Sequence, residues 1–73
     1  MKEYTIILDP DSEGAGYTVT VPALPGCVTQ GKNKEEAIER AKEAIALYIE
    51  SLVADGEPVP QEDHPVELIK LAV

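Results

Sequence analysis

The chain has 73 residues and a mass of 7.9 kDa, and its 14 acidic and six basic side chains give a formal net charge of −8 at pH 7. A chain of this length buries only about 60% of the surface that it exposes when unfolded, so one small domain over residues 1–73, alone or as an oligomer, is expected. No apolar run approaches the roughly 20 residues of a membrane-spanning helix. Residues 1–8 are too short and too acidic for a signal peptide, and one cysteine excludes an internal disulfide, so a cytoplasmic protein is expected.

The negative charge bears on the partners that the chain can bind. A surface with a pI near 4.4 repels phosphate backbones, so we expect no direct binding to nucleic acid. Such a surface suits a basic protein partner, although an acidic surface also serves solubility alone.

Two strands are predicted in the first third of the chain. Residues 3–8 are rich in β-formers and predict a strand in which Ile6 and Leu8 share a face. Turn formers over residues 9–16 predict a hairpin loop, after which apolar residues alternate with threonines over residues 17–21. The two strands are therefore expected to pair antiparallel.

A bend and a short third strand follow. Two prolines and a glycine over residues 22–26 turn the chain, because proline lacks a backbone donor and glycine permits a positive φ. Residues 27–30 are predicted as the third strand, which ends at Gly31.

One helix is predicted, beginning after Asn33. As N-cap, Asn33 offers its side-chain oxygen to the free amides of the first turn, and Glu36 occupies the N3 position of a variant capping box. Apolar residues recur at three- and four-residue spacing through about five turns, from Ala37 to Leu52. Gly56 is expected to end the helix, because the prolines that follow it prevent continuation.

The C-terminal part is predicted as a connector over residues 57–65 and a fourth strand over residues 66–73. The expected fold class is therefore α+β, with the element order β-β-β-α-β and one helix on a small mixed sheet. The expected strand order is 3-2-1-4, with the last strand parallel to the first.

The predicted fourth strand is apolar on both faces, which a strand covered by a single helix should not be. Exposed apolar edges are aggregation hazards that proteins usually cover. We therefore predict a homo-oligomer, a dimer or a tetramer, and most simply a two-fold dimer. Its interface is expected to include Val66, Leu68, Ile69, Leu71 and Val73.

Chemistry-bearing residues are sparse, and no catalytic residue, cofactor or metal is predicted. His64 lies in a proline-flanked connector, with no second histidine or cysteine near it, and is interpreted as an exposed loop residue. Cys27 could act as a nucleophile only beside a base and is interpreted as a small buried hydrophobe. Asp9, Asp11 and Glu13 have the spacing of the start of a calcium loop, but the glycine and glutamate that should follow are misplaced, so a solvated turn is favoured.

The segment from Gly16 to Gly31 (GYTVTVPALPGCVTQG), followed by Asn33 and by Glu-Ala, resembles the HicB antitoxin family. The pattern is a strand ending in proline, then Leu-Pro-Gly-Cys, a threonine and a glycine, a helix cap, and Glu-Ala at the start of an alanine-rich helix. The resemblance covers roughly residues 3–60. The residues that carry it are Gly16, Tyr17, Pro22, Leu24, Pro25, Gly26, Cys27, Thr29, Gly31, Glu36 and Ala37.

The resemblance implies a truncated RNase H-like fold of the order β-β-β-α-β and a binding protein that is not an enzyme. HicB-type domains neutralise HicA toxins, which are small, basic, mRNA-cleaving proteins, so the implied partner is a HicA-like toxin. Many HicB proteins carry a further DNA-binding module, which is not expected here because the chain stops after one strand. The alternative is a stand-alone HicB-like oligomeric domain that binds another partner or only itself.

Overall fold

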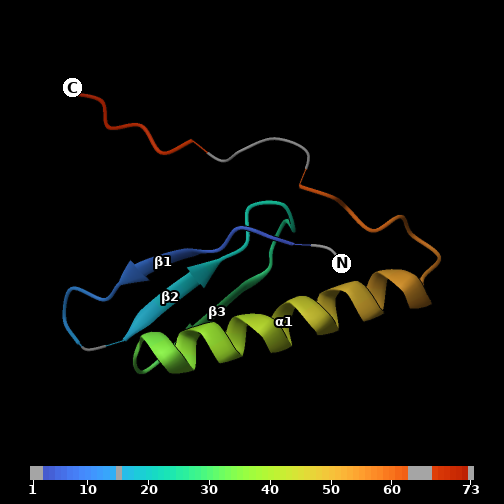
Figure 1. Cartoon of the computed structure of the whole chain (residues 1–73), viewed down its shortest axis with the longest axis horizontal. Helices are drawn as coiled ribbons and strands as arrows, with labels where there is room; N and C mark the ends of the chain where they lie inside the picture. The colour runs from blue at the N-terminus through green and yellow to red at the C-terminus, as the bar shows by residue number, and fades with distance from the viewer. Residues whose placement is uncertain (1–2, 15, 63–66, 73) are drawn as a thin grey trace.

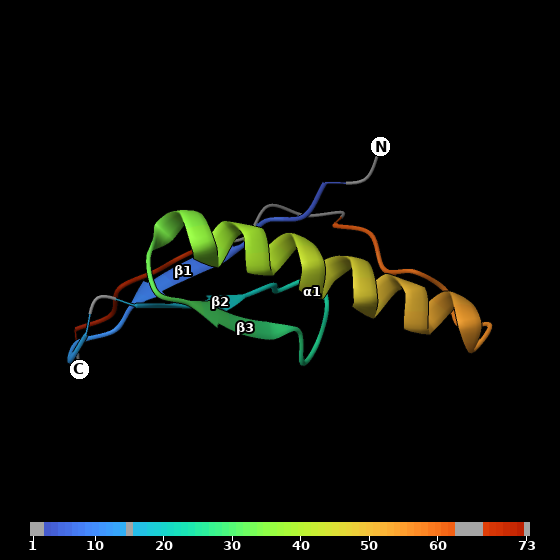
Figure 2. The same ribbon diagram turned by 90° about the horizontal axis from the view of Figure 1, so that it is seen from below.

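The computed structural model of the chain describes residues 3–14, 16–62 and 67–72. Its elements are β1 (Ile7–Pro10), β2 (Tyr17–Thr20), β3 (Val28–Gly31) and α1 (Lys34–Ala54). The strands form an antiparallel sheet with the order β1-β2-β3, and α1 lies across one face of this sheet (Figure 1; Figure 2). The predicted α+β class and the order β-β-β-α are therefore confirmed.

The pairing of the strands gives the sheet one covered face and one open face. Val19 in β2 is fully buried against α1. Its partners Leu8 and Thr29 share that face, because directly paired residues of neighbouring strands point the same way. Thr20, the next residue of β2, points to the opposite face, where its partner Val28 is 58% exposed.

The first strand begins later than predicted, at Ile7 instead of residue 3. Sheet pairing starts with Ile7 opposite Thr20. Earlier pairing would bring Thr5 opposite Pro22, but Pro22 has no amide hydrogen to donate, and the Thr5 amide bonds instead to the Glu62 carboxylate. β1 therefore starts where β2 offers free partners.

Two small clusters of buried residues join the helix to the sheet. The cluster nearer the start of α1 comprises Val19, Ala37 and Ala41. The second cluster comprises Val21, Leu24 and Cys27, with the half-buried Ala44, Ile45 and Tyr48 of α1 packed against it. The interpretation of Cys27 as a buried residue is confirmed, since only 5% of it is exposed.

The helix begins and ends at the predicted residues. The Asn33 Oδ1 accepts a hydrogen bond from the Glu36 amide at 2.8 Å, and Glu36 Oε1 accepts one from the amide of Lys32 at 3.2 Å. The carboxylate thus reaches one residue beyond the usual position of a capping box. Gly56 has a φ of 72°, and the amides that follow the helix bond back to carbonyls of its last turn, which is the Schellman ending.

The backbone of Gly31, the last residue of β3, packs directly against the backbone of the first turn of α1. A Cβ atom at this position would lie 2.6 Å from the Cα of Ala37, closer than real Cβ atoms come to another carbon. Ala37 is itself fully buried. Glycine at one position and alanine at the other therefore set the distance between the sheet and the helix.

After α1 the chain returns to its N-terminal residues. The Tyr4 hydroxyl donates a hydrogen bond to the carbonyl of Pro60 at 2.5 Å. The Glu62 carboxylate accepts one from the Thr5 hydroxyl at 2.5 Å and one from the Thr5 amide at 2.6 Å. Because the paired positions advance together along both segments, the connector runs parallel to the N-terminal segment here. The same two bonds, the hydroxyl first, hold the pKa of Glu62 below its usual range.

The predicted fourth strand is wrong over residues 67–72, because none of these residues lies in the sheet. The two ends of that prediction, Val66 and Val73, lie outside the described residues. Within the described part of the chain the sheet is accordingly antiparallel and not mixed.

Apolar character alone does not make a strand, because a strand forms only where a neighbouring edge supplies its backbone hydrogen bonds. Residues 67–72 have no such partner among the described residues, and Leu68, Ile69 and Leu71 are each more than 70% exposed.

We expect Gly31→Ala to lower the free energy of unfolding by about 1–3 kcal/mol, because the new carbon would press on the backbone of Ala37. Urea unfolding would measure the change. Gly14→Ala is the matched control: its Cβ would lie 3.4 Å from the Asp11 carboxylate, an ordinary contact, so a change below about 0.5 kcal/mol is expected. Equal losses in both variants would contradict the close approach.

We expect the Glu62 carboxyl to titrate below its ordinary pKa of 4.5, and Thr5→Val to raise that pKa by removing the hydroxyl. A pKa that is lower in the folded chain contributes stability above the unfolded-state pKa and loses it as the pH falls through the folded value. Glu62→Gln should therefore destabilise the chain at pH 7 and much less at pH 3. NMR titration and urea unfolding test both statements, and a wild-type pKa at or above 4.5 would contradict them.

Candidate protein-binding surface

The residues that carry the family resemblance gather in two groups, one at each end of the sheet. The first group, here the junction, lies where the hairpin loop and β3 meet the first turn of α1 and comprises Gly16, Tyr17, Gly31, Glu36 and Ala37. The second group, here the double turn, connects β2 to β3 and comprises Pro22, Leu24, Pro25, Gly26 and Cys27. Thr29 lies between the groups, in β3 and opposite Val19.

Two successive β-turns fold the double turn. The Leu24 amide donates to the carbonyl of Val21 at 3.0 Å, and the Cys27 amide donates to the carbonyl of Leu24 at 3.0 Å. Each turn has proline in its second position, and Gly26 supplies the φ of 80° that the third position of a type II turn requires. This geometry points Leu24 inward, where it is fully buried although it belongs to a loop.

Tyr48 ties the double turn to the middle of the helix. Its hydroxyl donates to the carbonyl of Pro25 at 2.7 Å, and its ring packs against the cluster of Val21, Leu24 and Cys27. The double turn is thus held by backbone bonds from within and by a side chain of α1 from outside.

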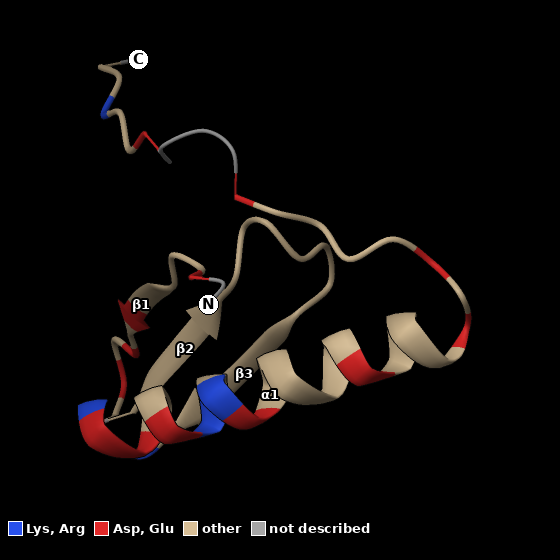
Figure 3. Ribbon diagram, turned by 45° about the vertical axis from the view of Figure 1, so that its right-hand side comes forward, with Lys and Arg blue, Asp and Glu red and all other residues tan. Residues whose placement is uncertain are grey.

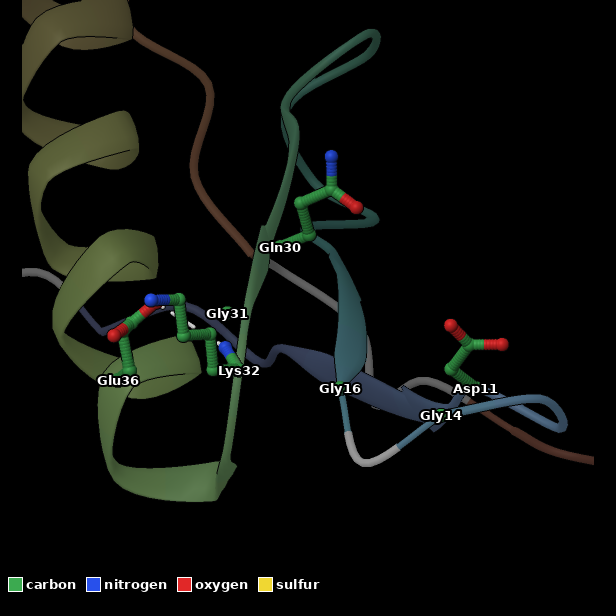
Figure 4. Close-up of a pocket in the computed structure, with 7 residues that line it drawn as sticks. All are labelled: Asp11, Gly14, Gly16, Gln30, Gly31, Lys32 and Glu36. Atoms are coloured by element: carbon green, nitrogen blue, oxygen red, sulfur yellow. Dashed lines mark hydrogen bonds between the residues drawn. The ribbon is translucent and has the colours of Figure 1, made fainter.

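A shallow depression of about 430 Å³ opens beside the junction (Figure 4). Its lining residues are Asp11, Gly14, Gly16, Gln30, Gly31, Lys32 and Glu36. In Figure 4, Asp11 lies on the side of the hairpin loop, whereas Lys32 and Glu36 lie on the side of the helix. A polar side chain of a partner would therefore meet the Asp11 carboxylate on one side, Lys32 and the Glu36 carboxylate on the other, and glycine backbone between them.

The open face of the sheet is polar with one apolar row. It consists of Ile7, Asp9, Thr18, Thr20, Val28 and Gln30. All of these residues except the half-buried Ile7 are exposed. A face of this composition stays soluble alone and can still dock a protein, since interfaces of this kind mix apolar and polar area.

Acidic and basic residues are distributed unevenly. The sequence has no Lys or Arg from Glu3 to Gly31 or from Glu43 to Ile69, and four of its six bases lie between Lys32 and Lys42. Figure 3 places basic residues on the first half of α1, whereas β1 and the loop after it carry acidic residues only. The exposed Asp9, Asp11 and Glu13 therefore have no neutralising base on their own hairpin. On the helix, by contrast, an acid has a basic neighbour: Lys42 Nζ lies 3.5 Å from Glu39 Oε1.

The remaining candidates from the sequence have the following places. His64 lies outside the described residues. Burial raises the pKa of the Cys27 thiol, which disfavours its reactive thiolate.

Over residues 3–14, 16–62 and 67–72, no group of three or more His, Cys, Asp or Glu could hold a metal ion. In the same part of the chain, no helix is long and apolar enough to cross a membrane.

The predicted interface residues differ in what the structure describes of them. Leu68, Ile69 and Leu71 are 78%, 72% and 78% exposed and belong to no strand of the sheet. Val66 and Val73 lie outside the described residues.

Sequence reasoning missed two contacts that hold this surface in place. It assigned Tyr48 to the apolar stripe of the helix and gave its hydroxyl no partner, and it treated Glu62 as part of a connector. The signal in the sequence is weak in both cases, because each bond joins residues that are far apart in the chain, 23 residues for Tyr48 and 57 for Glu62.

Comparison with known proteins identifies the family of the chain. Residues 4–71 match the family described as HicB-like antitoxin of bacterial toxin–antitoxin system. A UPF0150 protein of Thermoplasma acidophilum is 52% identical over 84% of this chain and 87% of its own length, and one of Synechocystis is 47% identical over 96% and 87%. Antitoxin HicB 1 of Photorhabdus laumondii is 40% identical over 78% of this chain, which spans only 36% of that relative.

The fold and its surface define a class of small α+β domain that has an open, largely polar sheet face and an acidic hairpin without a basic residue. Within that class, the chain belongs to the family of HicB-like antitoxins of bacterial toxin–antitoxin systems, because the match extends over almost all of its length. The resemblance inferred from residues 16–37 is therefore confirmed.

We expect Tyr48→Phe to lower the free energy of unfolding by about 1 kcal/mol, because the Pro25 carbonyl loses its hydrogen bond to the hydroxyl. The matched control is Tyr17→Phe, since the Tyr17 hydroxyl makes no hydrogen bond within the described residues. Urea unfolding of both variants and faster amide exchange at Leu24 and Cys27 in Tyr48→Phe are the measurements. Unchanged exchange in Tyr48→Phe would contradict the role given to Tyr48.

Proposed function

We propose that the chain is an antitoxin that binds a HicA-like toxin, a small basic mRNA-cleaving protein, and neutralises it by protein–protein contact. The observation that carries the proposal is the family match over residues 4–71, together with a net charge of −8 on the same chain. An acidic surface attracts a basic protein that has evolved to bind RNA, and charge complementarity speeds and orients the encounter.

The hairpin loop and the open face of the sheet are the surface that we assign to this partner. Asp9, Asp11 and Glu13 are exposed, and no basic residue of their own hairpin neutralises them. The neighbouring open face adds threonine hydroxyls and the exposed Val28, so the contact combines charge with polar and apolar area. The first half of α1 is a weaker candidate, because its acids alternate with Lys34, Arg40 and Lys42.

The chain acts in this proposal by covering the toxin, with no catalysis, cofactor or nucleic-acid contact of its own, and it acts in the cytoplasm. The truncated RNase H-like fold is also part of this proposal, because that fold requires a fourth strand beside β1. Nuclease chemistry of the RNase H type requires several carboxylates that converge on metal ions.

A second candidate function is a stand-alone HicB-like oligomeric domain with another partner. The exposed apolar side chains of residues 67–72 favour this second function, because an exposed apolar segment is usually buried against another surface, with or without a toxin. The presence of a gene for a short basic protein beside this one would favour the antitoxin.

We expect the chain to co-purify with the basic protein encoded next to it and the complex to weaken as the salt concentration rises. Neutralising the hairpin with Asp9→Asn, Asp11→Asn and Glu13→Gln together should lower the affinity at least tenfold at low salt and flatten its salt dependence. Calorimetric titration at two ionic strengths measures both quantities.

The control variant carries Glu35→Gln, Glu39→Gln and Glu43→Gln, which change the net charge equally on the exposed side of α1. A much smaller loss of affinity is expected for this control. Equal losses in the two variants would contradict the assigned surface, and no complex at low salt would favour the second candidate function.

A further inference from the structure

We propose that the second half of α1 is a docking surface for a basic amphipathic helix of another protein. The surface consists of an apolar stripe, formed by Ala46, Ile49 and Val53, and of two acids beside it, Glu43 and Glu50. It belongs to the helix and not to the hairpin or the open face of the sheet. The proposal therefore goes beyond the toxin contact assigned above and stands whether or not the chain binds a toxin.

The helix is longer than the sheet that it covers. α1 has 21 residues and a length of about 31 Å, whereas each strand has four residues and a length of about 13 Å. Figure 1 and Figure 2 both show the second half of α1 reaching past the ends of the strands. Among the described residues, Tyr48 is the last residue of α1 that packs against either buried cluster. The helix thus continues beyond the packing that these clusters provide.

The local sequence does not favour a helix at this end. Ile49 and Val53 are β-branched, which lowers their helix propensity. The last turn contains no basic residue, and Glu50 and Asp55 lie near the end at which the helix dipole is already negative. These residues are therefore kept in the helix at a cost to its stability, which indicates that they serve contacts outside the domain.

The apolar stripe has the spacing of a helix-binding surface. Ala46, Ile49 and Val53 follow one another at intervals of three and four residues, so they share one face of α1. Val53 is 62% exposed, Ala46 is exposed and Ile49 is half-buried. The stripe is about 10 Å long, which matches two turns of a partner helix whose apolar residues recur at the same spacing.

The acids beside the stripe select the charge of the partner. Glu43 and Glu50 are two helical turns apart and follow the stripe along one side. Both are exposed, and neither makes a hydrogen bond or an ion pair within the described part of the chain. Figure 3 shows no basic residue on the second half of α1. Lysines or arginines beside the apolar face of a partner helix would meet these carboxylates and the negative end of α1.

NMR titration of the isotope-labelled chain with a synthetic peptide tests the surface. The probe is an amphipathic peptide of leucine and lysine, about 18 residues long so that it can form a helix when bound, and a scrambled peptide of the same composition is its control. The amphipathic peptide is expected to shift the amide signals of residues 43–54 and to bind more tightly than the control.

Three results of this titration would overturn the proposal. The first is a set of shifts confined to the hairpin or the open face of the sheet, and the second is equal affinity of the two peptides. The third is a shift of the same signals with the concentration of the chain alone, which would assign the surface to a second copy. No toxin takes part in the titration, so its outcome is independent of the proposed function.

A pair of variants tests the apolar stripe. Val53→Ser is expected to lower the affinity for the amphipathic peptide about fivefold, because the side chain at this position is buried by the peptide. The matched control is Leu47→Ser: Leu47 is 66% exposed on the same helix but lies outside the stripe, so the affinity should be unchanged. Equal losses in the two variants would overturn the proposal.

A second pair of variants tests the acids. Glu43→Gln together with Glu50→Gln should lower the affinity for the amphipathic peptide about fivefold at low salt. The control, Asp11→Asn together with Glu13→Gln, changes the net charge equally but in the hairpin loop, and a much smaller loss is expected. Equal losses here would mean attraction by net charge alone and would overturn the assigned surface.

Discussion

The contact between Gly31 and Ala37 sets the arrangement on which the rest of the molecule depends. β3 passes into α1 through only Lys32 and Asn33, and the backbones touch where the strand ends and the helix begins. The direction of the helix is therefore fixed at its first turn, and the helix then lies mainly over β3 and β2, with Leu8 of β1 packed against the cluster of Val19, Ala37 and Ala41. Small residues at the contact bring the layers close, which is why a core with few fully buried side chains can hold them together.

Features that depend on neighbours in the sequence could be predicted. The cap at Asn33, the ending at Gly56 and the bend over residues 22–26 each follow from the chemistry of a few adjacent residues, and the structure has them at the expected positions. The alternation of apolar residues with threonines over residues 17–21 likewise predicted which face of β2 is buried. The same local logic identified Cys27 as buried, because it follows a tight turn at the start of a strand.

Features that depend on register between distant segments could not be predicted. β1 starts late because Thr5 would face Pro22, which has no amide hydrogen, and bonds instead to Glu62, and no periodicity in the sequence predicts that pairing. The fourth strand was inferred from the apolar character of residues 66–73 alone, whereas a strand needs a sheet edge to pair with, and residues 67–72 pair with none among the described residues. For the candidate surface, the family pattern predicted a set of residues that are scattered along the sequence. That they form two groups at opposite ends of the sheet could be seen only from the fold.

The position of Cys27 has a consequence for the chemistry of the chain. Its side chain is closed in by the double turn, and burial raises the pKa of its thiol, so both the access of reagents and the fraction of thiolate are reduced. Folded copies therefore resist oxidation and mutual cross-linking at this sulfur. Because the thiol reacts only when the double turn opens, its rate of alkylation measures how often that local unfolding occurs.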